Sequence, residues 1–147
     1  EKALQDYTTL KVYPKGSLCI AMYGATIGKT AILKIEACTN QACCILFNSP
    51  MANSKFVQYW FMSHRENIVN LANGGGQPNI SQNIIRDLRM AIPSIDEQNK
   101  IVNFIEKNEK SVGDLLIKIR KSIILLKERR TALISAAVTG QLKIPEK

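Results

Sequence analysis

The residues most suggestive of chemistry lie at positions 23–30, where the sequence YGATIGKT is similar to a Walker A phosphate-binding loop. A Walker A loop has the form G-x-x-x-x-G-K-[ST], and its lysine opens a helix whose N-terminal amides bind phosphate. Here Tyr23 stands where the first glycine is required, and Lys29 leads into the apolar, β-branched sequence TAILKI. The pattern therefore predicts a glycine-containing loop between two strands and no nucleotide-binding site.

The other familiar catalytic arrangements are also missing from the sequence. No G-x-S-x-G elbow accompanies the single histidine, His64, which we expect at the exposed side of a helix. The segment Asn48-Ser49-Pro50-Met51 is not the Asn-Pro-Pro-aromatic tetrad of an amino-methyltransferase. The sequence also lacks a pair of carboxylates with a neighbouring lysine, the arrangement that would indicate a nuclease centre. We therefore predict a chain that is not an enzyme and binds no cofactor.

The four cysteines predict neither a metal site nor a disulfide framework. Cys19, Cys38, Cys43 and Cys44 contain no C-x-x-C pair, and His64 is remote from them in sequence. Cys43 and Cys44 lie in an apolar run, so we expect them to be small buried residues of a reduced protein.

A second polar segment, residues 74–82 (GGGQPNISQ), favours binding over catalysis. Asn and Gln side chains can pair with adenine edges, and Lys and Arg can contact guanine or phosphate. In a second interpretation, which the sequence leaves open, Asn79 and Gln82 only cap a short helix. The candidate DNA-binding residues are Lys29, Gln77, Asn79, Ser81, Arg86 and Arg89.

The charge of the chain favours an anionic partner such as nucleic acid. Twenty Lys and Arg against twelve Asp and Glu give +8 over 147 residues. No apolar run approaches the ~18 residues of a membrane span. We therefore expect no membrane segment and a cytoplasmic location.

Residues 1–92 are expected to form a small α+β domain. Apolar segments at 17–23, 29–35 and 42–47 predict three strands, whose close spacing indicates an antiparallel or mixed sheet. A helix is expected from Pro50 to about Leu71, and a shorter one with Asn79 as its N-cap. A short strand at 88–92 completes the expected elements.

Residues 94–138 predict one long helix with the repeat of a coiled coil. Ser94 and Glu97 form an S-x-x-E capping box, and Gly140 follows the expected end. At ~1.5 Å per residue the helix is about 65 Å long, too long for the rest of the chain to cover, so we expect a second helix as partner. Apolar residues recur at steps of three and four: Ile101, Ile105, Val112, Leu115, Ile119, Leu126 and Leu133, with Asn108, Ser122 and Arg129 or Arg130 at the intervening positions.

Several motifs together resemble one known family. They are GSLCIAMYGATIGKTAI, TNQACCILF, NGGGQPNISQNIIRDLRMAIPSIDEQNKIVNFI and the closing KERRTALISAAVTGQLKI. In this order they are similar to the specificity subunit of type I restriction–modification systems, over about residues 13–144.

The resemblance implies a subunit with two target-recognition domains, each followed by a long helix, and an antiparallel pairing of the two helices as a spacer. It implies that each domain reads half of a split double-stranded DNA target. It also implies that adenine methyltransferase subunits, which use S-adenosylmethionine, and a motor-nuclease subunit dock on this subunit, which is itself not catalytic.

The sequence departs from that pattern by its length. It resembles a partial target-recognition domain (residues 1–92), one long spacer or dimerisation helix (94–138) and a C-terminal tail (139–147), and it opens abruptly at Glu1. We therefore expect a fragment or a half-subunit, with the helix partner in the same subunit or in a second copy. The alternative function is a helical protein-interaction adaptor that binds no DNA.

Overall fold

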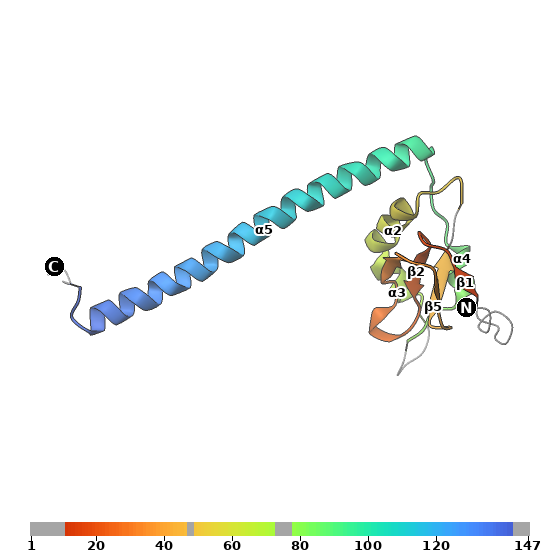
Figure 1. Cartoon of the computed structure of the whole chain (residues 1–147). Coiled ribbons are helices and arrows are strands. Elements are labelled where there is room, and N and C mark those ends of the chain that lie inside the picture. Colours follow the sequence, from red (N-terminus) through yellow and green to blue (C-terminus); the bar gives the residue numbers. More distant parts are fainter. Residues whose placement is uncertain (1–10, 47–48, 73–77, 143–147) are drawn as a thin grey trace. The chain divides into compact units, whose positions relative to one another are not determined.

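The computed structural model describes residues 11–46, 49–72 and 78–142 (Figure 1). The chain divides into two compact units, one that runs to Val102 and one that begins at Asn103. The first unit holds all of the strands and short helices of the described residues, and most of the second is helix.

The first unit is built on a three-stranded antiparallel sheet. Strand β2 (Leu18–Ala21) lies between β3 (Thr30–Ile32) and β5 (Cys43–Leu46). The three predicted strands and the antiparallel alternative are therefore confirmed. A second small sheet pairs β1 (Val12–Tyr13) with β4 (Ala37–Cys38), which the sequence did not predict, because two residues are too few for a recognisable alternation.

The core lies on one face of the three-stranded sheet. Leu18 and Ile20 of β2 point to this face, together with Cys44 of β5, as the alternation of side chains along a strand requires. Phe61 and Ile68, from the helices that follow, pack against them.

The helix expected from Pro50 to about Leu71 is two helices, α2 (Ser54–Ser63) and α3 (Arg65–Asn70). Asn53 is the N-cap of α2, because its side-chain oxygen accepts hydrogen bonds from the amides of Lys55 and Phe56. The prediction of a single helix starting at Pro50 was therefore wrong.

The break between α2 and α3 lies at His64, which is half-buried instead of exposed as expected. Its ring stacks on that of Trp60 with centroids 4.3 Å apart. Its Nδ1 and the Ser63 hydroxyl each lie 2.9 Å from the Trp60 carbonyl oxygen. Side-chain bonds of this kind compete with the backbone ladder of a helix, which explains an interruption without Pro or Gly.

The next predicted elements also need correction. Helix α4 (Gln82–Asp87) is capped by Ser81, whose hydroxyl accepts from the Ile84 amide at 3.3 Å, and not by Asn79. Residues 88–92 form no strand. Leu88 and Met90 pack against the core from irregular backbone, so their apolar character reflects burial and not membership of a sheet.

The long helix α5 (Ile95–Val138) has the predicted ends. The Ser94 hydroxyl accepts from the Glu97 amide at 3.4 Å, as the first half of the capping box requires. At the other end Gly140 has φ +73°, and the Gln141 amide donates to the Ala136 carbonyl, as in a Schellman motif. No helix of the described residues is long and apolar enough to cross a membrane.

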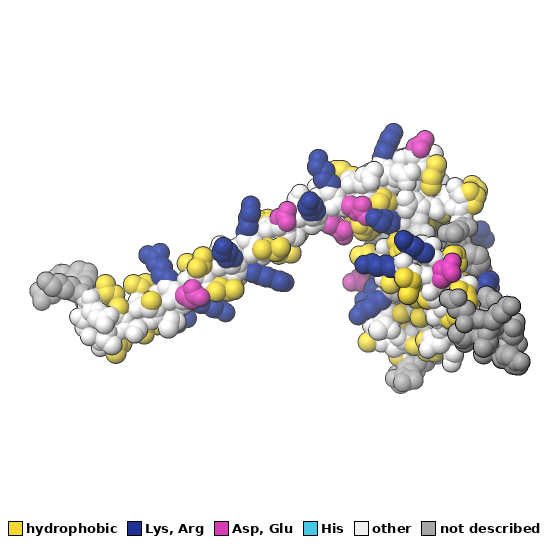
Figure 2. Space-filling view, viewed as in Figure 1, with side chains coloured by type: hydrophobic (Ala, Val, Ile, Leu, Met, Phe, Trp, Pro, Cys, Tyr) yellow, Lys and Arg dark blue, Asp and Glu magenta, His cyan; other side chains and the backbone are white. Residues whose placement is uncertain are grey.

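Apolar side chains lie exposed along α5 within its own unit (Figure 2). The predicted seam residues between 112 and 133 are all at least 45% exposed. Ile123, next to the predicted seam position Ser122, is 47% exposed as well. The intervening seam positions Asn108, Ser122 and Arg129 or Arg130 stay predictions.

The start of α5 is part of the first unit and is held there by Gln98. This side chain is completely buried. Its Oε1 accepts from the Asn53 amide at 2.8 Å, and its Nε2 donates to the carbonyl oxygens of Met51 (2.8 Å) and Pro93 (2.9 Å). One side chain therefore binds three backbone groups, two in residues 51–53 and one just before α5.

Replacing Gln98 by Leu should lower the free energy of unfolding by about 3 kcal/mol, because three buried backbone groups would lose their partner. Urea unfolding followed by circular dichroism measures this. The matched control is Asn99→Ala, which removes one exposed hydrogen bond to the Asn53 side chain and should cost less than about 1 kcal/mol. Equal losses for the two variants would contradict the role given to Gln98.

Candidate nucleic-acid interface

The two segments singled out in the sequence are neighbours in the structure. The Gly24 amide donates to the Pro78 carbonyl, and the Ile80 amide donates to the Met22 carbonyl, both at 2.9 Å. Tyr23 and Asn79 form the antiparallel bridge between these bonds. The loop between β2 and β3 and the segment that leads into α4 therefore form one continuous surface.

The loop between β2 and β3 has a backbone shape that glycine permits. A short 3-10 turn, η1 (Gly24–Thr26), opens it, with φ +56° at Gly24 and +72° at Gly28. Lys29 follows and leads directly into β3, so it opens no helix. The sequence-based interpretation of a loop between two strands is confirmed.

Arg65, at the start of α3, holds this loop in place. Its Nε donates to the Ile27 carbonyl and its Nη2 to the Ala25 carbonyl, each at 3.1 Å. A Cβ on Gly28 would lie 3.1 Å from the Arg65 Cγ, so the arginine stem packs directly on the loop backbone. The sequence analysis missed Arg65, because nothing in its spacing connects it with a loop nearly forty residues earlier.

Four of the six candidate DNA-binding residues are exposed without a structural role that uses up their side chains. Lys29 and Asn79 lie on the joined loops, and Arg86 and Arg89 lie in and just after α4. Arg86 makes a weak hydrogen bond of 3.4 Å to the Gln82 side chain. Lys29 lies directly before β3, and the two arginines lie in and just after α4.

The two remaining candidates have different outcomes. Ser81 is exposed, but its hydroxyl caps α4, so the capping interpretation holds at Ser81 and not at Asn79. Gln77 lies outside the described residues.

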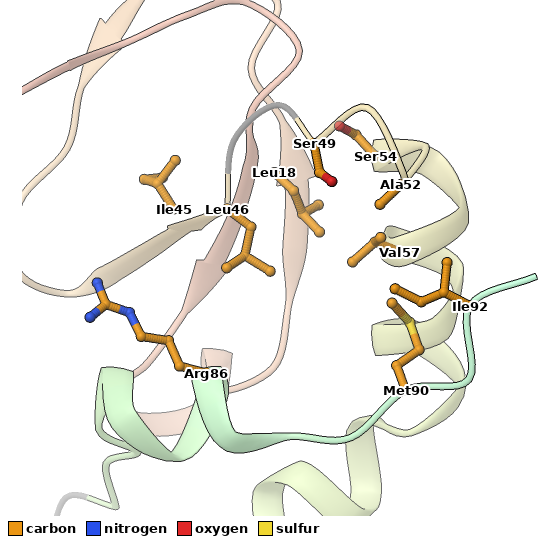
Figure 3. Close-up of a pocket in the computed structure, with 10 residues that line it drawn as sticks. All are labelled: Leu18, Ile45, Leu46, Ser49, Ala52, Ser54, Val57, Arg86, Met90 and Ile92. Atoms are coloured by element: carbon orange, nitrogen blue, oxygen red, sulfur yellow. The ribbon is translucent and has the colours of Figure 1, made fainter. Parts of the chain in front are cut away.

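A cavity of about 460 Å³ lies beside β5 and is mainly apolar (Figure 3). Leu18 and Leu46 of the sheet line it, with Val57 of α2 and Met90 after α4. Arg86 is its one charged lining residue and lies at the α4 end. This lining is unlike a phosphate site, so we do not count the cavity as part of the interface.

Two of the four cysteines lie where burial suppresses the thiolate. All four are free thiols, and no cluster of three metal-ligating side chains occurs among the described residues. Burial, together with the neighbouring Cys43, raises the pKa of Cys19 to about 12. Burial also raises the pKa of Cys44, although the nearby positive charge of Arg86 opposes the shift.

The comparisons with known proteins agree with one another. The model of the family described as type I restriction modification DNA specificity domain matches residues 1–124. A chain from a structural study of complex assembly and conformational transition of the type I R-M system is 18% identical, with a TM-score of 0.71. That match covers 86% of this chain and 31% of the other.

The S subunit of a type I restriction-modification system from M. genitalium is 22% identical, with a TM-score of 0.57 over 71% of this chain and 29% of that chain. The chain thus spans less than a third of the length of either solved structure. At these identities the likeness shows a shared fold.

Arg65→Ala should lower the free energy of unfolding by about 1–3 kcal/mol, because two carbonyl groups of the loop lose a charged donor. Arg65→Lys keeps the charge but not the forked geometry, and should recover only part of the loss. Urea unfolding measures both. The control is Lys34→Ala, which removes an exposed cation beyond the other end of β3. If Arg65→Ala lowered the free energy of unfolding no more than this control, Arg65 would not be holding the loop.

Iodoacetamide at pH 8 should alkylate the exposed Cys38 first. Cys19 should react at least about a hundredfold more slowly than in the denatured chain, because its raised pKa leaves almost no thiolate. Only as the pH approaches 12 should that protection disappear. Mass spectrometry of digests taken at successive times measures the alkylation rate of each cysteine. Equal rates for Cys19 and Cys38 would argue against a raised pKa of Cys19.

Proposed function

The chain belongs to the family of type I restriction modification DNA specificity domains, and we propose on this basis that it recognises a DNA sequence for a restriction–modification complex. The observation that carries the proposal is the junction of the two polar loops, through Tyr23 and Asn79, on one surface. A net charge of +8 suits a polyanionic partner.

The DNA contacts that we propose are of two kinds. Lys29, Arg86 and Arg89 contact phosphates, because they are exposed cations whose charge no salt bridge within the described part of the chain neutralises. Asn79 contributes its side-chain amide from the residues before α4, and Ser81 can still donate the hydroxyl hydrogen that its cap does not use. Backbone or phosphate contact is favoured over base reading for both, and Gln77 stays a candidate outside the described residues. Arg65 positions the Lys29 loop by its two carbonyl bonds.

In this proposal the chain is a recognition component and catalyses no reaction. Adenine methyltransferase subunits modify the target and a motor-nuclease subunit cleaves unmodified DNA, in the cytoplasm where the DNA lies. The two loops support this function over that of a pure helical adaptor. Such an adaptor would not need the Lys29 loop that Arg65 holds in place. The domain limits 1–92, 94–138 and 139–147 stay part of the proposal, with the first turns of α5 packed on the recognition unit through Gln98.

The apolar seam of α5 takes a second long helix as its partner. Val112, Leu115 and Leu126 are each more than half exposed in the chain by itself. Burying such side chains stabilises a helix pair by roughly 25 cal/mol for each Å² removed from water. Asn108 lies on the same face and would set register more than strength.

Replacing Lys29, Arg86 and Arg89 by Glu, in the intact subunit that contains this chain, should weaken DNA binding and flatten its salt dependence. The slope of log K against log salt should fall by about 0.9 for each phosphate that the variant no longer neutralises. Fluorescence anisotropy with labelled target DNA, at several salt concentrations, measures the slope.

Lys34→Glu is the matched control for each single replacement, because it changes the charge by the same amount beyond the opposite end of β3. It should lower affinity slightly with little change in slope. An unchanged slope in the Lys29, Arg86 and Arg89 variants would remove these residues from the interface.

A further inference from the structure

Tyr23 is a large exposed residue, at the junction of the two loops, that the proposed DNA contacts leave unused. It follows β2 with an extended backbone (φ −126°, ψ 143°), and the residue is 46% exposed. No residue of the described part of the chain bonds to its hydroxyl group. A half-exposed tyrosine offers a partner one apolar ring face and one hydrogen-bond donor.

The side chain of Tyr23 points away from the core. Leu18, Ile20 and Met22 are all buried on the core side, so the alternate residues of this extended segment face the other way. The Met22 amide donates to the Ala42 carbonyl at 2.9 Å, which continues the antiparallel pairing past the end of β2. Tyr23 therefore lies on the outer face of the three-stranded sheet, the face opposite the core.

Lys29 lies on the same outer face. It directly precedes Thr30, which pairs with the buried Ile20 and has its own hydroxyl oxygen buried. The alternation of side chains along β3 turns Lys29 the other way, in agreement with its exposure. The Ala21 amide donates to the Lys29 carbonyl at 2.9 Å. Lys29 thus lies across from Ala21, the neighbour of Tyr23 on the outer face.

Asn79 completes this group of exposed side chains. It forms an antiparallel bridge with Tyr23, and the main-chain hydrogen bonds lie on either side of the bridge instead of within it. In a pair of this kind the Cα atoms are about 4.5 Å apart and the side chains are at their closest. The next residue, Ile80, is buried, so Asn79 shares the outer face with Tyr23. A cation, a phenol and an amide therefore lie on one face.

The position of Tyr23 suits the outside of a DNA duplex better than its grooves. Its backbone is fixed at a strand junction, and more than half of its surface is covered. Reading a base edge requires an element that enters a major groove about 8.5 Å deep, which a ring held against a sheet does not do. The sugar–phosphate backbone presents deoxyribose next to phosphate oxygens, and a phenol ring with its hydroxyl can contact both.

We propose that Tyr23 and Asn79 form an uncharged contact to the sugar–phosphate backbone of double-stranded DNA, beside the phosphate contact of Lys29. The ring of Tyr23 packs against a deoxyribose, and the Tyr23 hydroxyl and the Asn79 amide donate to phosphate oxygens. The inference rests on the proposed DNA binding. It adds Tyr23 to the interface, the chemistry of the contact and its independence from the base sequence.

An uncharged contact has a signature that separates it from the cationic ones. Donors without charge displace no condensed counterions, so their loss lowers affinity by the same factor at every salt concentration. Contacts to the DNA backbone carry no sequence information directly. The factor should therefore be the same for target DNA and for a duplex of equal length that lacks the target.

Fluorescence anisotropy of the intact subunit that contains this chain, with both duplexes and at several salt concentrations, tests the inference. Tyr23→Ala should weaken binding about tenfold on both duplexes with no change in salt slope, because ring and hydroxyl are lost together. Tyr23→Phe keeps the ring and should weaken binding only about threefold. Asn79→Ala should also cost about threefold, again on both duplexes and without a change in slope.

Met62→Ala is the matched control, because Met62 is 52% exposed on α2, the helix that packs on the core side of the sheet. It should leave the DNA affinity unchanged. Urea unfolding of every variant shows whether the fold is kept. Tyr23→Phe removes a single exposed oxygen, so it keeps the test decisive even if Tyr23→Ala is unstable.

Three results would overturn the inference: Tyr23→Ala and Tyr23→Phe binding as tightly as Met62→Ala, a loss confined to the target duplex, or a flattened salt slope. Normal binding by these variants, with a slope that still depends on Lys29, Arg86 and Arg89, would refute this contact alone. The expected loss at Tyr23, with a slope that does not depend on those cations, would refute only the cationic contacts. A wild-type subunit that binds neither duplex would refute the proposed function, and this inference with it.

Discussion

The buried amide of Gln98 is the contact that fixes the first turns of α5 within the first unit. An amide in the core is costly unless its groups are bonded, and here they bond to Met51, Asn53 and Pro93. Asn53 also caps α2 and donates from its side chain to Asn99. The starts of α2 and α5 are therefore specified together, and the first turns of the long helix, to Val102, belong to the core of the domain.

The remainder of α5 presents the opposite situation, in which apolar surface lacks cover within its own unit. A 44-residue helix with a stripe of half-exposed Ile, Leu and Val residues is favourable only when another apolar surface removes that stripe from water. Such a helix gains length and straightness from its backbone bonds, but its stability comes from what it packs against. This exposed stripe is therefore the physical reason for the partner helix that we propose.

The candidate interface shows how backbone bonds can leave side chains available for binding. The two loops are joined through Gly24, Pro78 and Ile80 by main-chain hydrogen bonds. Arg65 then holds carbonyl groups of the first loop, so the conformation beside Lys29 does not depend on the Lys29 side chain. A rigid backbone with outward polar side chains reduces the entropy lost when a polyanion binds.

The sequence by itself determined the features that depend on local periodicity: three short strands and both ends of α5, whereas the structure decided between an antiparallel and a mixed sheet. It also indicated a loop at Lys29, because a missing glycine and a β-branched run are local signals. The tertiary structure alone decided that Ser81 and not Asn79 caps α4, that His64 divides one helix into two, and that Arg65 and Gln98 hold distant segments. The bonds of Arg65 and Gln98 join residues about 40 positions apart, and a single long-range hydrogen bond leaves no repeat in the sequence by which it could be recognised.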